Sequence, residues 1–424
     1  MRSISHIAAA CTIAAALAVP AAAEAQTAVR PEPPDPFITT LVSRLDLEKY
    51  KATIKGLTQF GDRRQGTDRN RAAVDWIEAQ LKSYGCTPTA RITYDFNPAP
   101  RAPAAGRGGA GGAAGGRGGA AGGRGGAAGA GRGQSDAAQG GGRIRGIRAR
   151  TGVNSDSTKQ PDAKLRALDT PQTVNGERQE VYCTKVGTTH PDEMYIVGGH
   201  MDGIGWGEAA NDDGSGTALV MEVARVFSSP DVKTDRSIRF ILWNNEESGL
   251  DGAKAYVAQR EALQGKEDPA GSGKYPEPKW LGMIQHDMMM FDHGMPHADG
   301  TLSPEQRPEA NVNIEFAGTS KFADGANKLA WAFQTANEKY ATDYPAQVGQ
   351  HMTNTDSDPF KDIIPALSLR ENERGAQVGA GWDPNWHQPT DLYSTYNDKD
   401  FRLGLNAAQT TLSAIATLVH ATPK

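Results

Sequence analysis

The chain has 424 residues, of which 38% are hydrophobic, and its formal net charge is -5. This length provides enough apolar surface for one large α/β domain, which excludes a small scaffold stapled by disulfides or metals. The charge lacks the basic excess that binds nucleic acid or anionic membranes, so we expect neither as a partner.

The first 25 residues have the pattern of a secretory signal peptide. Arg2 precedes an apolar stretch over residues 7–19, and small residues lead to a predicted cleavage site after Ala25. The stretch is shorter than the roughly 20 residues of a membrane helix, and no later segment supplies one. We therefore predict an exported chain, periplasmic or secreted, without a membrane span. A lipoprotein modified at Cys11 is an open alternative.

Folded structure is expected to begin near Phe37, after an extended leader at residues 26–36 that is rich in proline and polar residues. A helix is predicted to start with a cap at Thr67 or the next residue and to end at Gly85. Its apolar face holds Ala73, Ile77, Leu81 and Tyr84. A strand is predicted over residues 90–96.

Two cysteines, Cys86 and Cys183, remain once the signal peptide is removed. An even number in an oxidising compartment permits one disulfide, and two separate buried thiols are equally compatible with the sequence. The pairing is therefore left open.

Residues 98–176 begin with repeated GGRGG and GGAAGG units and continue as a polar stretch without aromatic residues. Such a composition buries too little apolar surface to fold, so we predict a disordered insertion. Arginine-glycine repeats also bind single-stranded nucleic acid, but the aromatic side chains that stack on bases are missing, which favours a surface loop. Residues 37–97 and 177–424 would then form a single domain.

Short apolar runs bounded by turn residues predict strands over residues 179–186, 194–199, 237–243 and 280–285. Helical patterns alternate with these runs: one follows Gly216, and another closes the chain over residues 401–419. This alternation predicts an α/β fold with a mostly parallel central sheet flanked by helices.

Side chains that commonly bind metals follow three of these strands where each strand ends. His200 and Asp202 follow the second predicted strand, Glu246 and Glu247 follow the third, and Asp287 follows the fourth. Because the carboxyl ends of parallel strands meet at one edge of a sheet, we expect these side chains to lie close together.

Two further candidate ligands lie in connecting segments. Asp212, in the turn NDDGSG, can bring a carboxylate to the same edge, and His387 lies in the late loop WHQPTD. Each motif alone is typical of a surface pair, a solvated helix start or a turn. Together they supply two imidazoles and three carboxylates, with one glutamate over for proton transfer, which is the donor set of a two-metal site.

The motifs GGHMDG, NDDGSG, NNEESGLDGAKAY, HDMM, SDPF and WHQPTDLYST, in this order, resemble the signature blocks of a known family. It is the family of di-zinc exopeptidases that includes aminopeptidase Y, the bacterial leucyl aminopeptidases and the glutamate carboxypeptidases. The resemblance extends from about Phe37 to the C-terminus, apart from the insertion. It implies a single zinc-exopeptidase-like domain and a zinc metallopeptidase.

The resemblance also implies that two zinc ions share the carboxylate of Asp212. His200 and Asp287 would complete one zinc site, and Glu247 and His387 would complete the other.

The candidate catalytic residues are Glu246 and Asp202. The resemblance implies that Glu246 is the general base and that the carboxylate of Asp202 fixes the tautomer of His200. It further implies a cis peptide bond between Asp212 and Asp213.

Two positions depart from the family pattern. Trp386 stands where many relatives have a tyrosine that donates to the oxyanion, so the identity of that donor is left open. Pro359 stands in the SDPF block where a histidine is frequent, which leaves the role of Asp358 open.

We expect an exported exopeptidase that acts on peptides or dipeptides, and we favour an aminopeptidase because a free α-amine suits such a site. A carboxypeptidase or dipeptidase is the nearest alternative. Arg370 and Arg374 could bind a substrate carboxylate, although two exposed arginines are the simpler interpretation. A single-zinc acyltransferase resembling glutaminyl cyclase, supported by Trp386, and a non-enzymatic binding module are further alternatives. The side-chain preference and the oligomeric state are not predicted.

Overall fold

The structure is a computed structural model that describes residues 32–97, 153–169, 175–291, 311–350, 352, 354–371 and 383–424. The predicted signal peptide, much of the predicted leader and most of the predicted insertion lie outside the described residues. Residues 34–424 form one unit, and the fold below is that of this unit.

Eight strands form the central sheet: β1 (Thr89–Phe96), β2 (Gly176–Lys185), β3 (His190–His200), β5 (Arg236–Trp243), β6 (Lys279–His286), β7 (Val312–Glu315), β8 (Ala346–Gly349) and β9 (Ala366–Glu371). Their order across the sheet is β1-β2-β5-β3-β6-β9-β7-β8. Strands β4 (Val232–Lys233) and β10 (Thr422–Pro423) form a separate small pair.

The middle of the sheet is parallel. Strand β3 pairs in parallel with both β5 and β6, and β6 pairs in parallel with β9. Antiparallel pairs occur toward the two edges, between β1 and β2, β2 and β5, and β7 and β9. The predicted α/β fold with a mostly parallel central sheet is confirmed, and each of the four predicted core strands is present.

The described α-helices are α1 (Pro36–Val42), α2 (Leu47–Thr58), α3 (Asp68–Ser83), α4 (Ala163–Leu168), α5 (Gly214–Phe227), α6 (Asp251–Arg260), α7 (Ala323–Tyr340) and α8 (Asp398–Leu418). Short 3-10 helices are η2 (Ser157–Lys159), η3 (Glu261–Leu263), η4 (Asp358–Phe360) and η5 (Tyr393–Thr395). Helix α1 begins at Pro36, the last residue of the predicted leader, because the Asp35 side chain caps it.

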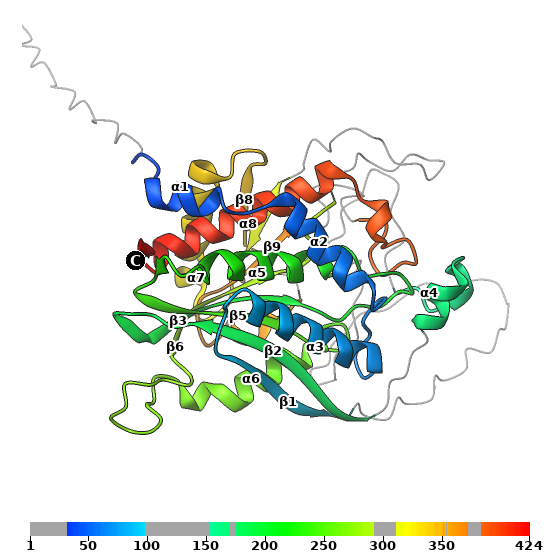
Figure 1. The fold of residues 1–424 in the computed structure, drawn as a ribbon, viewed down its shortest axis with the longest axis horizontal. Helices are drawn as coiled ribbons and strands as arrows, with labels where there is room; N and C mark the ends of the chain where they lie inside the picture. The colour runs from blue at the N-terminus through cyan, green and yellow to red at the C-terminus, as the bar shows by residue number, and fades with distance from the viewer. Residues whose placement is uncertain are drawn as a thin grey trace, which may run out of the picture. The chain divides into compact units, whose positions relative to one another are not determined.

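The helices divide between the two faces of the sheet. Helices α1, α2, α3, α5, α7 and α8 share one hydrophobic core with the sheet, whereas α6 and η4 contribute to a second core on the other face. Figure 1 shows α5 and α8 running along one side of the sheet and α6 on the opposite side. Every residue of α5 except Arg225 is buried, so this helix lies in the middle of its layer.

Helix α3 follows its sequence signals closely. The Thr67 side chain accepts a hydrogen bond from the backbone N–H of Asn70, which satisfies a donor in the first helical turn. The predicted apolar face is buried at Ala73, Ile77 and Leu81. Just beyond the helix, Gly85 adopts a φ of 79°, a left-handed conformation that glycine reaches without steric cost.

Cys86 and Cys183 form a disulfide, which decides between the two alternatives that the sequence left open. The bond joins the segment after α3 to strand β2 across a sequence separation of 97 residues.

One part of the predicted insertion is folded, which corrects the predicted range. Residues 153–169 contain η2 and α4, and α4 is capped by Asp162, whose side chain accepts two backbone N–H groups. Asp169 is fully buried and accepts a hydrogen bond from the backbone N–H of Asp62. Composition alone missed this segment, because polar side chains, rather than an apolar face, attach it to the domain.

Within the described ranges, no helix combines the length and the apolar character that a membrane-spanning helix needs.

Candidate metal centre

The candidate ligands meet where β3, β5 and β6 end. His200 is the last residue of β3 and pairs in register with Trp243, the last residue of β5. Its neighbour Gly199 pairs with His286, the last residue of β6. The loops that follow β5 and β6 therefore start beside His200, as expected for parallel strands.

His200 lies at the centre of the first group of ligand-type side chains. Its Nε2 atom is 3.4 Å from Oδ1 of Asp212 and 3.8 Å from Oδ1 of Asp287. His200, Glu246 and Asp287 form a group whose candidate ligand atoms all lie within 4.8 Å of one another.

The second group forms around His387. Its Nε2 atom is 2.9 Å from Oδ2 of Asp212 and 2.9 Å from Oε2 of Glu247. Asp212 thus directs one oxygen to each histidine, which is the arrangement of a carboxylate that bridges two cations. The structure brings all of the candidate ligands together. The peptide bond between Asp212 and Asp213 is cis, as the resemblance implied.

Burial and charge make this cluster strongly attractive for cations. Burial tends to lower the pKa of His200, but the nearby carboxylates of Glu246 and Asp213 outweigh it and hold that pKa well above its usual value. In the same way, Glu247 and Asp212 overcome burial and raise the pKa of His387 to about 10. Burial raises the pKa of Glu247 to about 7. The carboxylates therefore stabilise positive charge in a buried site. Divalent cations bound there could provide this charge in place of the protonated histidines.

The donor chemistry fits zinc. Histidine nitrogens and carboxylate oxygens are the ligands that zinc takes in catalytic sites. The Oε1 atom of Glu247 is buried and has no hydrogen-bond partner within the described part of the chain, so its lone pairs are available to a metal ion. Burying a carboxylate oxygen without a hydrogen-bond partner or a cation costs free energy of folding.

Asp202 holds the centre in a different way from the one predicted. His200 Nδ1 is 2.9 Å from the backbone carbonyl of Asp202, whereas the Asp202 carboxylate is 3.9 Å away. Since a carbonyl only accepts, Nδ1 carries a hydrogen, and Nε2, which faces Asp212 and Asp287, is the nitrogen that would bind a metal. The carboxylate instead accepts the backbone N–H of Glu246 at 3.1 Å. The prediction assumed an extended chain through Asp202, but β3 ends at His200.

Asp391 is a site residue that the predictions missed. Its carboxylate accepts the backbone N–H of Asn211 at 2.8 Å and that of Asp212 at 3.1 Å. Burial, followed by the charge of Asp383, raises the pKa of Asp391 to about 8. The sequence did offer one indication of this role: Asp391 lies four residues after His387, in the motif WHQPTD that was selected for its histidine.

Arg370 is buried rather than exposed, which corrects one interpretation from the sequence. Only 1% of the residue is accessible, and its Nη2 atom is 2.8 Å from Oδ2 of Asp287. The parallel pairing of β9 with β6 brings Arg370 beside the residue that follows β6. Arg374 lies outside the described residues.

Trp386 and the SDPF block can also be located. The Trp386 ring stacks on the His387 ring, with centroids 3.9 Å apart. Asp358, the first residue of η4, forms an ion pair with Lys361, which follows η4. Asp356 is the buried carboxylate of this segment, and its Oδ2 accepts a hydrogen bond of 3.3 Å from Gln285.

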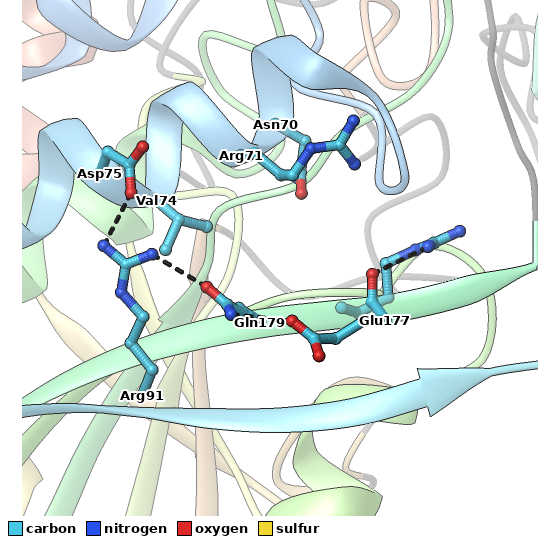
Figure 2. Close-up of a pocket in the computed structure, with 8 residues that line it drawn as sticks. Asn70, Arg71, Val74, Asp75, Arg91, Glu177 and Gln179 are labelled. Atoms are coloured by element: carbon cyan, nitrogen blue, oxygen red, sulfur yellow. Dashed lines mark hydrogen bonds and ion pairs between the residues drawn. The ribbon is translucent and has the colours of Figure 1, made fainter.

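A separate cavity of about 230 Å³ lies between α3 and strands β1 and β2, as Figure 2 shows. None of the candidate metal ligands lines it. Arg91 in this cavity donates hydrogen bonds to Asp75 and Gln179, so its charge is already engaged within the chain. The cavity is therefore not part of the metal centre.

Two histidines and several carboxylates that gather around one aspartate at the carboxyl edge of a parallel sheet form the donor set of a two-metal site. Residues 180–409 match the model of Peptidase family M28, and this match covers more than half of the chain. The chain therefore belongs to Peptidase family M28, which confirms the family resemblance.

Individual relatives are similar over parts of their length. Aminopeptidase YwaD of Bacillus subtilis (strain 168) is 36% identical over 116 residues, which are 27% of this chain and 24% of that enzyme. Carboxypeptidase Q of Xenopus laevis is 35% identical over 71 residues, 17% of this chain and 15% of that protein. The chain thus matches about a quarter or less of the length of these two relatives.

A solved structure resembles the whole fold. The aminopeptidase from Aneurinibacillus sp. strain AM-1 aligns with a TM-score of 0.55 and 19% identity, covering 91% of this chain and 97% of that one. A likeness at this level of identity concerns the fold.

Proposed function

We propose that this protein is a zinc-dependent aminopeptidase that uses two metal ions. The observation that carries the proposal is the position of Asp212, whose two carboxylate oxygens face His200 and His387 separately. Membership of Peptidase family M28 supports the peptidase class, and the name of the similar Bacillus subtilis protein supports the aminopeptidase type.

The proposed ligands follow from the two groups around the histidines. His200 and Asp287 would hold one zinc ion, Glu247 and His387 the other, and Asp212 both. Zinc bound in this way would lower the pKa of a water molecule from 15.7 toward about 7 and polarise the scissile carbonyl.

Glu246 is the proposed general base. Its carboxylate belongs to the group around His200, and its backbone N–H donates to Asp202, so it would lie beside a water molecule bound at this centre. It would accept a proton as the water attacks the peptide carbonyl. It would then return this proton to the amine that leaves, which makes one residue base and acid in turn.

Arg370 bears on the choice between aminopeptidase and carboxypeptidase. A carboxypeptidase needs a cation that is accessible to the substrate carboxylate, but Arg370 is buried and paired with Asp287. A free α-amine, in contrast, suits a site rich in carboxylates. These contacts favour an aminopeptidase, although the similarity to carboxypeptidase Q keeps that activity as the second candidate.

A single-zinc glutaminyl cyclase-like activity is the remaining enzymatic alternative, and the stacking of Trp386 on His387 is the observation in its favour. The two activities differ in metal content, because the cyclase alternative uses one zinc ion per chain.

We also propose that the protein is exported after cleavage behind Ala25. The disulfide between Cys86 and Cys183 supports an oxidising compartment. The intact mass of the protein recovered outside the cytoplasm tests the cleavage site.

The activity is tested with the purified mature protein and dipeptides that carry either a blocked amino terminus or an amidated carboxyl terminus. An aminopeptidase cleaves the C-amidated substrate, spares the N-blocked one and loses activity when zinc is chelated. Cleavage of only the N-blocked substrate would establish the carboxypeptidase instead. Cyclisation of an amino-terminal glutamine without dipeptide hydrolysis would establish the cyclase.

A further inference from the structure

Residues 153–169, which we call the docked segment, contact the loops that carry the candidate ligands. The backbone N–H of Asn154 donates to the carbonyl of His387 at 3.0 Å. The side chain of Gln160 reaches the same loop and also the loop that follows His200. None of the candidate metal ligands belongs to the docked segment. The segment can therefore affect the metal centre only through these two loops.

Gln160 connects the two loops with one amide group. Its Nε2 atom is 2.6 Å from the carbonyl of Trp206 and 3.1 Å from the carbonyl of Pro389. Trp206 follows His200 by six residues, and Pro389 follows His387 by two. The Oε1 atom accepts the backbone N–H of Asp162 at 3.1 Å. Carbonyls only accept hydrogen bonds, so an NH₂ group is required at this position.

The two loops are in close backbone contact. A Cβ atom placed on Gly205 would lie 2.3 Å from the carbonyl carbon of His387, and one on Gly207 would lie 2.8 Å from the carbonyl oxygens of Gln388 and Asp391. Glycines permit this approach, but they bring no side chain to hold the loops together. The two loops share a direct hydrogen bond from the backbone N–H of Glu208 to the carbonyl of Asp391 at 2.8 Å, and the buried amide of Gln160, with 1% of the residue accessible, adds a side-chain connection.

Both loops also contain backbone strain next to these contacts. Trp206 has a φ of 72° and His387 a φ of 56°, in the left-handed region that bulky side chains disfavour. Such conformations persist only where the surrounding structure holds them. The carbonyl of Trp206 is bound by Gln160, and the carbonyl of His387 is bound by Asn154.

The docked segment is itself firmly attached. Arg166 donates from Nη1 to the carbonyl of Gln160 at 2.6 Å, and Asp169 accepts the N–H of Asp62 at 3.0 Å. Beside Asp62, the buried guanidinium of Arg63 donates to the carbonyls of Met201 and Ala209, at 2.7 and 2.8 Å. The loop after His200 is therefore held from both sides.

We propose that Gln160 is a positioning residue of the metal centre: it ties the loop after His200 to the loop of His387, so that the two imidazoles face Asp212 together. The inference deepens the proposed function and rests on it for the catalytic consequence. The connection between the loops, however, can be measured without any substrate.

The test replaces Gln160 by glutamate in the full mature chain. Gln160→Glu keeps the size of the side chain but turns carboxylate oxygens toward two carbonyls. The matched control is Gln59→Glu, the same substitution at an exposed residue whose amide donates to the carbonyl of Gly56 at the end of α2. Zinc retention against a chelator, hydrogen exchange of residues 201–209 and 383–391, and kcat and KM are measured for each variant.

We expect Gln160→Glu to lose one of its zinc ions roughly 10 to 100 times more readily than wild type, the range found when outer contacts of metal ligands are removed. Amides in the two loops should exchange faster, and kcat should fall more than KM rises. Gln59→Glu should match wild type in all three measurements. Zinc retention and loop exchange equal to those of wild type would overturn the inference.

Two further results keep this test separate from that of the proposed function. If Gln160→Glu does not yield folded protein, Gln160→Met, which has a similar size but no donor, is measured with the same expected and contradicting results. If wild type binds zinc but hydrolyses no peptide, the proposed function fails, while metal retention and hydrogen exchange still decide on Gln160.

Discussion

The guanidinium of Arg370 lies 2.8 Å from Oδ2 of Asp287, while the other oxygen of this carboxylate is directed toward His200. The pair is almost completely buried, with 1% and 5% of the two side chains accessible. A cation built into the chain thus offsets part of the negative charge that the centre gathers before any metal binds.

Removing this cation should destabilise the metal-free protein. Truncating one partner of a buried pair leaves the other charge uncompensated, which costs about 3–5 kcal/mol. We predict a loss of this size in the free energy of unfolding of zinc-free Arg370→Gln, measured by denaturant titration. Arg236→Gln, which removes a partly exposed partner of Glu193, should cost at most about 1 kcal/mol. Equal losses in the two variants would contradict the prediction.

Glu246→Gln should separate metal binding from catalysis. The amide cannot accept the proton of the attacking water, so kcat should fall about 10² to 10⁴-fold while the zinc content stays at the wild-type value. Elemental analysis and steady-state kinetics measure the two quantities on one preparation. Glu261→Gln, at an exposed residue of η3, is the control. Wild-type turnover in fully loaded Glu246→Gln would show that another group is the base.

Asp391→Asn should weaken zinc binding without removing a ligand. The two oxygens of Asp391 accept the backbone N–H groups of Asn211 and Asp212 separately, and asparagine replaces one of these oxygens with an NH₂ group, which cannot accept. The turn that presents Asp212 should lose part of its support, and we predict an affinity for zinc about 10 to 100 times weaker in competition with a chelator. Asp398→Asn, at an exposed residue of α8, should bind zinc as wild type does. An unchanged affinity in Asp391→Asn would assign Asp391 no part in the centre.

The environment of Glu78, a residue of α3 outside the metal centre, leads us to predict that the protein loses stability in acid. Hydrogen bonds from Lys82, Arg91 and Thr89 overcome burial and lower the pKa of Glu78 from 4.5 to about 2. The ionised form is therefore preferred in the folded state, and its contribution is fully present above pH 4.5 and disappears as the pH falls toward 2.

In Glu78→Gln, we expect the free energy of unfolding to be lower by up to about 1 kcal/mol at neutral pH, the range for partly exposed pairs. The difference from wild type should shrink as the pH falls from 4.5 toward 2. Urea titrations at several pH values measure it. A difference that is constant with pH would mean that the ionised carboxylate makes no specific contribution.

The core strands and the ligand positions were predictable from sequence because apolar runs and the polar residues after them are local signals. The predicted run over residues 237–243 ends where β5 ends, and the run over residues 194–199 ends one residue before the end of β3. The helix predicted to follow Gly216 begins earlier, at Gly214, because the Asp213 side chain accepts the backbone N–H of Gly216 and caps the helix inside the turn.

The supporting contacts were not predictable in this way. Gln160, Arg370 and Asp391 act through partners that are distant in sequence, and neither periodicity nor composition specifies which carbonyl or carboxylate a polar side chain will meet. The role of Asp202 was misjudged for a related reason, since the direction of its carboxylate depends on the residue at which β3 ends. Burial of these polar groups follows from tertiary packing alone.

The number and position of the metal ions test the central proposal most directly. The measurement is an X-ray structure of the zinc-loaded protein with data collected on both sides of the zinc absorption edge. We predict two anomalous peaks, one on each side of the Asp212 carboxylate. One peak should lie within bonding distance of His200 and Asp287, and the other within bonding distance of Glu247 and His387. A single peak, or peaks that do not contact Asp212, would contradict a centre built on one shared carboxylate.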